Sequence, residues 1–92
     1  MIDSSTMFQK VADVIEDDLD DSIVVGDPSG SRWLILKGTA TDVWHLLDRP
    51  EEVASLVAVL AKRYNGSPEQ IHQDVSSLLD RLRKLGIVSV VL

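Results

Sequence analysis

Hydrophobic and polar positions divide this chain into two parts with different periodicities. Short apolar runs broken by polar stretches occupy residues 8–36, whereas apolar residues recur every three or four positions across residues 39–85. The first pattern is typical of strands and the second of amphipathic helices. The sequence therefore predicts an α+β fold in which three N-terminal antiparallel strands precede a three-helix bundle.

The predicted strands cover residues 10–15, 22–25 and 31–36. The acidic run 16–21 is expected to be a solvated turn between the first two strands. Residues 26–30 combine Asp, Pro and Gly, which predicts a tight turn and hence a hairpin between the second and third strands. The third strand is apolar at successive positions, so both of its faces are expected to be covered. We also expect this strand to lie at an edge of the sheet.

Three helices are predicted after the strands. The first spans residues 39–48, and the second restarts at Arg49-Pro50-Glu51-Glu52 and ends at Gly66. Ser67-Pro68-Glu69-Gln70 is a capping box that begins the third helix, and Gly86 is expected to end it before a short strand in residues 87–92. The apolar stripes are Ala40, Val43, Trp44 and Leu47; then Val53, Leu56, Val57, Leu60 and Tyr64; then Ile71, Val75, Leu78, Leu82 and Leu85, with Leu79 at one edge.

Length and composition fit a single domain over residues 1–92, with residues 1–7 expected to be flexible. Hydrophobic residues make up 45% of the chain and charged residues 26%, as in ordinary globular proteins. The absence of cysteine excludes a thiol nucleophile, a thiolate metal site and a disulfide framework. Neither a membrane span nor a signal peptide is visible, so we expect a soluble cytoplasmic protein with no membrane partner.

The acidity of the chain is confined to its first third. The net charge is −6; residues 1–30 carry one base and eight acids, whereas residues 31–92 carry eight bases and seven acids. A nucleic-acid-binding domain needs a basic face, which the balance of the whole chain opposes. We therefore expect no nucleic-acid partner.

No motif for catalysis, metal binding or cofactor binding is present. His45 and His72 lack metal-ligand spacing, and the acidic run has neither the central Gly nor the closing Glu of a calcium loop. Asp21-Ser22-Ile23 resembles the phosphopantetheine site of carrier proteins, but residues 23–28 would break the helix which that site requires. We therefore expect a non-catalytic protein with no metal or cofactor.

The third strand is the best candidate for a binding site. An exposed strand edge offers unpaired N–H and C=O groups to an extended peptide. Trp33 is an amphipathic side chain of the kind that anchors interfaces. The alternative is that Trp33 belongs to the core, because a small domain needs its aromatic residues inside.

Two segments make the sequence resemble the PqqD-like family, the RiPP recognition elements of pathways that make ribosomally synthesised, modified peptides. They are Leu36-x-Gly-Thr-Ala-Thr-Asp-Val-Trp44-x-Leu-Leu-Asp48 and Asp74-Val75-x-x-Leu-Leu-x-x-Leu82-x-x-x-Gly86-Ile87-Val88. The resemblance implies a winged-helix-like fold that binds the leader of a precursor peptide as a strand added to the third strand. The third helix would form the other wall of the groove.

Carried onto this sequence, the resemblance implies a peptide-binding site on two elements. The backbone of the third strand would pair with the leader, and side chains of the third helix would line the groove. The residues concerned are Arg32, Trp33, Leu34, Ile35, Leu36, Asp74, Val75, Leu78, Arg81 and Leu82. The resemblance leaves open which edge of the helix faces the peptide. The charge change after residue 30 further suggests that Arg32, Arg81 and Arg83 attract acidic leader residues.

Within the family, the chain is most similar to free-standing leader-binding proteins of lasso-peptide clusters. Such a protein delivers the precursor to a cysteine-protease-type leader peptidase or another modifying enzyme. Residues 23–28 depart from the pattern of members that serve pyrroloquinoline quinone synthesis, which remain an alternative as peptide chaperones. A winged-helix DNA-binding domain is a further alternative, although residues 69–77 lack bases. An acidic protein-interaction or antitoxin-like domain is the last alternative.

Overall fold

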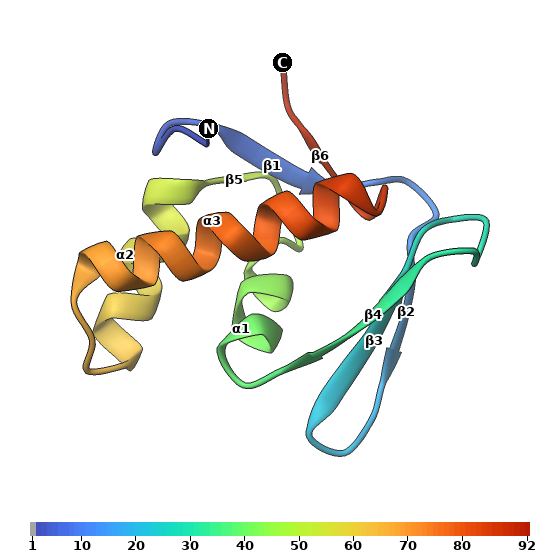
Figure 1. Cartoon of the computed structure of the whole chain (residues 1–92), viewed down its shortest axis with the longest axis horizontal. Helices are drawn as coiled ribbons and strands as arrows, with labels where there is room; N and C mark the ends of the chain where they lie inside the picture. Colours follow the sequence, from blue (N-terminus) through green and yellow to red (C-terminus); the bar gives the residue numbers. More distant parts are fainter. Residues whose placement is uncertain (1) are drawn as a thin grey trace.

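The strands form two separate three-stranded sheets, and three helices pack beside them (Figure 1). The computed structural model describes residues 2–92. The elements in chain order are β1 (Met7–Lys10), β2 (Ile15–Asp18), β3 (Ser22–Gly26), β4 (Trp33–Lys37), α1 (Thr39–Leu46), β5 (Glu51–Glu52), α2 (Val53–Arg63), α3 (Pro68–Lys84) and β6 (Val88–Val90). The predicted α+β class, with antiparallel strands ahead of three helices, is confirmed.

The two sheets have different roles. In the first sheet, β1 lies between β5 and β6, so this sheet contains strands from three distant parts of the chain. In the second, β2, β3 and β4 follow one another as an antiparallel meander. We call this second sheet the meander sheet; in Figure 1 it extends to one side of the helices. The predicted hairpin between the second and third strands is its β3–β4 pair.

The core lies between the helices and one face of each sheet. Val25 of the meander sheet and Phe8 of β1 are completely buried, as are Trp44, Leu60 and Leu79 of the helices. Burial of such side chains stabilises a fold by about 1.5–3 kcal/mol each relative to exposure. One contiguous core therefore holds both sheets and all three helices together.

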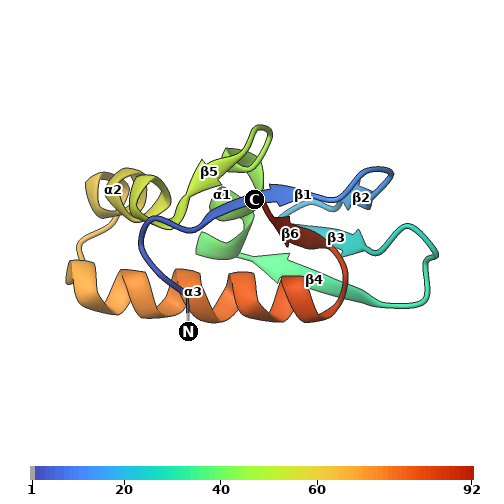
Figure 2. The ribbon, with the colours of Figure 1, turned by 90° about the horizontal axis from the view of Figure 1, so that it is seen from above.

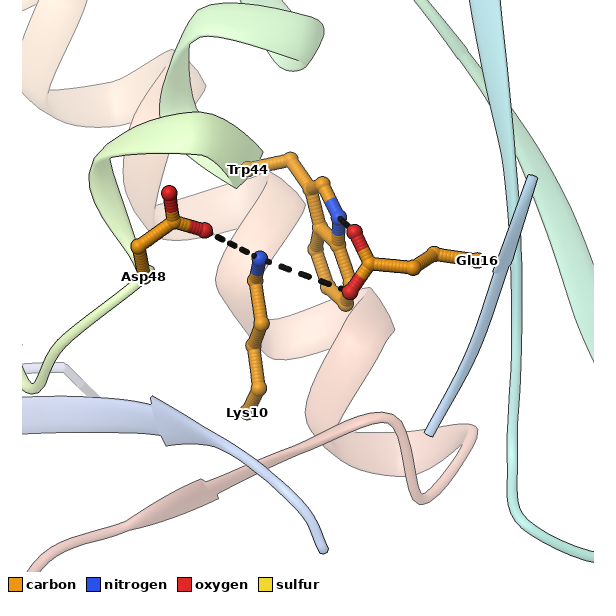
Figure 3. Close-up of polar contacts among 4 residues, drawn as sticks. All are labelled: Lys10, Glu16, Trp44 and Asp48. Atoms are coloured by element: carbon orange, nitrogen blue, oxygen red, sulfur yellow. Dashed lines mark hydrogen bonds and ion pairs between the residues drawn. The ribbon is translucent and has the colours of Figure 1, made fainter. Parts of the chain in front are cut away.

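A polar cluster around Trp44 connects the two sheets to α1 (Figure 3). The Lys10 ammonium lies 4.4 Å from the centroid of the Trp44 ring, and the Trp44 indole N–H donates to Glu16 Oε1 at 3.1 Å. Lys10 also pairs with Asp48 at 2.9 Å and with Glu16 at 3.7 Å. The hydrogen bond from Lys10 holds the pKa of Asp48 below its usual value. This cluster fixes β1 and β2 relative to α1.

The predicted first strand is wrong in its boundaries. Residues 10–15 are not one strand, because a turn with Asp13 at φ 62° separates β1 from β2. The acidic run is also not a simple turn, since Glu16–Asp18 lie in β2 and only residues 19–21 turn. Acids are poor strand formers, but pairing with the apolar β3 overrides that preference. The strand tolerates these acids because all four residues of β2 are exposed to solvent.

The second and third helices correct two further predictions. Glu51 and Glu52 do not start α2; they form the short strand β5 against β1. On α3, the buried side is centred on Leu79, which is fully buried, whereas Leu78 is only half-buried. The helical period does not by itself fix which residues lie at the centre of a broad apolar stripe, so packing of α3 against α2, β6 and α1 decided it.

The predicted ends of α3 are confirmed in detail. The Ser67 hydroxyl accepts from the Gln70 N–H at 3.1 Å at the start of the helix. At the other end Gly86 has a φ of 78°, and Ile87 N–H donates to Leu82 O at 2.9 Å. This is a Schellman cap, which needs the left-handed conformation that glycine adopts at low cost. The short final strand after it is confirmed as β6.

Residues near the N-terminus contact α2. The Thr6 carbonyl accepts from the Val53 N–H at 3.1 Å, and the Ser4 carbonyl accepts from the Ala54 N–H at 2.9 Å. The expected flexibility of residues 1–7 falls in part on Met1, outside the described residues, and stays a prediction. Across residues 2–92, no helix is long and apolar enough to span a membrane.

Candidate functional site

The free edge of β4 is the first component of the candidate site. β4 is the last strand of the meander sheet and pairs only with β3 in the described chain, as expected for an edge strand. Asp27 N–H donates to Arg32 O at 2.9 Å, which makes these two residues a hydrogen-bonded pair of the β3–β4 ladder. Such pairs alternate with non-hydrogen-bonded pairs along an antiparallel ladder.

The alternation decides which main-chain groups of β4 are available. Leu34 and Leu36 lie opposite Val25 and Ile23 in hydrogen-bonded pairs, so their N–H and C=O groups face β3. The other three residues turn these groups toward the open edge; they are Trp33, Ile35 and Lys37. An extended peptide added to this edge would therefore hydrogen-bond to those three residues.

The side chains of β4 alternate between two environments. Leu36 is buried and Leu34 half-buried against the core, whereas Trp33 and Ile35 are 60% and 45% exposed on the opposite face. The expectation that both faces of this strand are covered is therefore wrong. The helices cover one face of the meander sheet only. Trp33 is accordingly not a core residue.

The C-terminal end of α3 lies next to the start of β4. Figure 2 shows β4 as the strand of the meander sheet nearest to α3. The two elements meet where the Arg32 guanidinium donates to the Lys84 carbonyl at 3.2 Å, at the C-terminal end of α3. In Figure 1 they diverge from this end toward the N-terminal half of α3, with α1 between them.

An apolar pocket lies at the broad end of this arrangement. Its volume is about 320 Å³, and it is lined by residues of α1, of the end of α2 and of the first half of α3: Thr39, Ala40, Val43, Leu60, Tyr64, Gly66, Gln70, Ile71, Asp74, Val75 and Leu78. Thr39 and Ala40 follow β4 directly after Gly38. The pocket therefore lies just beyond the C-terminal end of β4.

Tyr64 gives the pocket a polar rim. Its hydroxyl donates to Asp42 Oδ2, and Arg63 lies 3.6 Å from the same carboxylate. The hydrogen bond to Asp42 raises the pKa of Tyr64, with burial and the negative charge of Asp42 adding to the effect. Tyr64 therefore stays protonated, as a donor, at neutral pH.

The structure distributes the ten sequence-predicted residues over four environments. Leu36, Val75 and Leu82 belong to the core, although Val75 also lines the pocket. Asp74 and Leu78 lie on the edge of α3 that faces α1 and line the pocket. The remaining residues lie on or beside β4, except for Arg81, which is exposed on α3.

The basic residues of α3 lie on different sides of the helix. Arg81 lies one turn beyond Leu78, whereas Arg83 pairs with Asp80 at 2.9 Å. Asp80 and Arg83 line a hollow beside Ile2 and Val90, away from α1. Lys84 and Arg83 together lower the pKa of Asp80 through their hydrogen bonds. Arg83 therefore lies away from the pocket that Asp74 and Leu78 line, and its expected attraction for acidic leader residues stays a prediction.

Sequence reasoning missed the contribution of α1 and α2 to the pocket. Ala40 and Tyr64 were assigned only to apolar stripes, yet both line the pocket. Two signals point to them. A small residue at the start of α1 leaves space, and Tyr64 ends the α2 stripe with a hydroxyl group, which usually finds a partner at a surface.

The two histidines lie apart from the pocket and the open edge of β4, and His45 lines a shallow hollow with Asp18, Asp20 and Asp21. His72 Nε2 lies 3.3 Å from the Ser4 hydroxyl on the far side of α3, and His45 is exposed. Among residues 2–92, no group of three or more His, Cys, Asp or Glu side chains is arranged to hold a metal ion. What the β4 edge and the pocket offer chemically is a row of main-chain hydrogen-bonding groups beside an apolar cavity.

These features define a small α+β module with an open strand edge beside a helix-lined pocket. The family described as coenzyme PQQ synthesis protein D (PqqD) matches residues 22–88, which include the meander strands β3 and β4 and all three helices. The chain belongs to this PqqD family.

A solved structure shares the fold. It is TbiB1 in complex with the TbiA(beta) leader peptide, which matches with a TM-score of 0.79 over 88% of this chain and 94% of that chain. The two sequences are 16% identical, so the likeness concerns the fold. No curated protein sequence matches the chain significantly.

Proposed function

We propose that this chain is a non-catalytic recognition domain, spanning residues 1–92, that binds the leader of a ribosomally made precursor peptide. The observation that carries the proposal is the open apolar edge of β4 beside the pocket between α1 and α3. Membership of the PqqD family supports it. The likeness to a protein solved with a leader peptide supports it further.

The leader binds as an additional strand of the meander sheet. Its main chain hydrogen-bonds to Trp33, Ile35 and Lys37, which gives affinity without dependence on the leader's sequence. Its side chains alternate in direction, so every second one turns toward α3 and the pocket. Specificity therefore comes from the fit of those side chains to the surface around Leu78.

Charge along the groove adds a smaller contribution. Arg32 and Arg81 are exposed near the C-terminal half of α3, where they attract acidic leader residues. Such contacts act through the solvent and weaken as salt rises. Substitution of both by Gln should lower leader affinity about two- to fivefold at low salt and flatten its salt dependence.

The bound leader brings the precursor to a separate enzyme in the cytoplasm. That enzyme is a cysteine-protease-type leader peptidase of a lasso-peptide pathway or another modifying enzyme. Holding the precursor beside the enzyme raises the local substrate concentration without any catalytic group on this chain. A role as a peptide chaperone for pyrroloquinoline quinone synthesis uses the same groove and differs in the leader that it selects.

Fluorescence polarisation tests the proposal directly. The labelled probe is the leader half of a short precursor encoded beside this gene, and labelled duplex DNA is the control. Saturable leader binding without DNA binding is the expected result. A folded chain that does not bind the leader would overturn the proposal, and DNA binding would favour the winged-helix alternative instead.

A further inference from the structure

The outward face of the meander sheet carries an apolar hollow that the groove does not use. Residues that lie opposite one another in the ladders share this face: Ile15, Gly26 and Trp33 form one row, and Asp17, Val24 and Ile35 form the next. The hollow has a volume of about 420 Å³ and is lined by Ile15, Val24, Gly26, Gly30 and Trp33.

Large apolar side chains are exposed around this hollow. Ile15 is 44% exposed and lies two strands away from the β4 edge, and Trp33 and Ile35 stand on the same face. A Cβ atom at Gly26 would lie 3.3 Å from the Arg32 carbonyl, so only glycine leaves the floor of the hollow open at this point. Contiguous exposed apolar surface on a small protein marks an interaction site.

Acidic side chains flank the hollow on the β2 side. Asp17 lies on the outward face itself, one row from Ile15, and Asp18 follows it on the same edge strand. Neither Asp17 nor Asp18 forms an ion pair with a base in residues 2–92. On the β4 side the face carries Lys37, so the unbalanced negative charge is confined to the β2 side.

This charge distribution selects the occupant. A second copy of the chain would bring its own acidic β2 strand to the contact, and nucleic acid or an anionic lipid surface would add negative charge. The complementary partner is a protein surface with an apolar projection flanked by Lys and Arg side chains. Trp33, Ile15 and Ile35 supply the central anchors that such interfaces use.

We propose that the modifying enzyme docks on this outward face through such a surface. The inference rests on the proposed function, since it assumes that the leader occupies the β4 edge. A strand added to β4 extends the sheet, so every second leader side chain stands on the outward face beside Trp33 and Ile35. The enzyme therefore contacts the bound leader and the recognition domain together.

The test measures two affinities in the same variants. Isothermal titration with the purified leader peptidase encoded beside the precursor gives enzyme binding, and fluorescence polarisation with the labelled leader gives peptide binding. Ile15→Lys should weaken enzyme binding about tenfold or more, because it places a charge in the hollow. Leader affinity should stay within about twofold, since Ile15 is remote from the β4 edge.

Two further variants complete the design. Ala58→Lys adds the same charge on an exposed position of α2 and should leave both affinities unchanged. Val24→Thr keeps a β-branched residue in the central strand and introduces a hydroxyl into the hollow, so it serves if Ile15→Lys does not fold. Circular dichroism checks that each variant is folded.

The outcomes separate this inference from the proposed function. Unchanged enzyme affinity in folded Ile15→Lys and Val24→Thr would overturn the docking surface. Wild-type chain that binds the leader but not the enzyme would also overturn it and leave leader recognition standing. If the wild-type chain fails to bind the leader, the proposed function fails, and enzyme binding that depends on Ile15 would still establish the docking surface.

Discussion

The two edges of the meander sheet are chemically opposite. β2 forms one edge with the sequence Ile-Glu-Asp-Asp and is exposed throughout, whereas β4 forms the other with Trp-Leu-Ile-Leu-Lys. Every free strand edge presents unpaired main-chain groups that can accept a further strand. Acidic side chains discourage strand addition at β2, and no acid stands on β4. The sheet therefore leaves one edge open to a peptide and protects the other.

The protected edge is also tied to the rest of the molecule. Glu16 of β2 accepts a hydrogen bond from the Trp44 indole and lies near Lys10, so β2 is fixed against α1 (Figure 3). β4 has a comparable polar contact at one end, from Arg32 to the end of α3. The comparison teaches that charge and anchoring together determine which edge of a small sheet stays available.

The largest expected effect is at the open edge. Ile35→Pro removes an N–H that faces outward and leaves the β3–β4 hydrogen bonds intact. Leader affinity should fall about tenfold or more, because one main-chain hydrogen bond is lost and the ring obstructs the added strand. Fluorescence polarisation with the labelled leader measures the change.

Asp18→Pro is the matched control on the other edge. Asp18 lies opposite Ile23 in a non-hydrogen-bonded pair, so its N–H also faces outward, but from the acidic strand. Leader affinity should stay within about twofold of wild type. Equal losses in Ile35→Pro and Asp18→Pro would show that the edges are equivalent, contrary to the comparison.

The pocket beside the open edge gives the next effect in size. Leu78→Ala removes a half-buried side chain from the pocket wall and should weaken leader binding about fivefold through lost apolar contact. Val57→Ala removes a half-buried side chain from a different hollow, next to His72, and serves as the control. A leader affinity that responds equally to both substitutions would mean that the pocket does not select the leader.

The sequence predicted elements with strong local signals. The capping box at Ser67 and the glycine at residue 86 located α3, and Asp27-Pro28 located the hairpin. These signals act through a few neighbouring residues, so they can be interpreted without the fold. They placed the open edge and one wall of the candidate site.

Long-range pairing explains what the sequence did not predict. β5 exists because β1 lies beside Glu51 and Glu52, and β2 because β3 offers an apolar partner. The exposure of Trp33 follows from helices covering only one face of the meander sheet, which no local pattern encodes. The pocket likewise combines three helices, so its α1 and α2 residues could not be assigned from one stripe.

Neutralising the protected edge should make it associate weakly. Asp17→Asn with Asp18→Asn removes two charges from β2 and leaves its unpaired main-chain groups in place. The double variant should show concentration-dependent self-association by analytical ultracentrifugation where the wild type does not. Asp20→Asn with Asp21→Asn removes the same charge from the adjacent turn and should remain like wild type. Identical behaviour of both pairs would indicate a general charge effect instead.

The smallest expected effect concerns the turn that connects β3 to the open edge. Asp27 accepts from the Ser29 hydroxyl at 2.7 Å and from the Arg32 N–H at 2.9 Å, and these bonds lower the pKa of Asp27 below its ordinary 3.8. A lowered folded-state pKa adds stability above the ordinary value, and this stability is lost as pH falls through the folded pKa. Asp27→Asn keeps an acceptor without the charge.

The thermal midpoint of wild type should therefore exceed that of Asp27→Asn by about 1–2 °C at neutral pH. Asp48 and Asp80, whose pKa values are also lowered, are present in both proteins and contribute equally to their loss of stability in acid. The difference in midpoint should shrink as pH falls below 3.8, where Asp27 becomes protonated. A difference that persists unchanged into acid would mean that the turn depends on the shape of residue 27 and not on its charge.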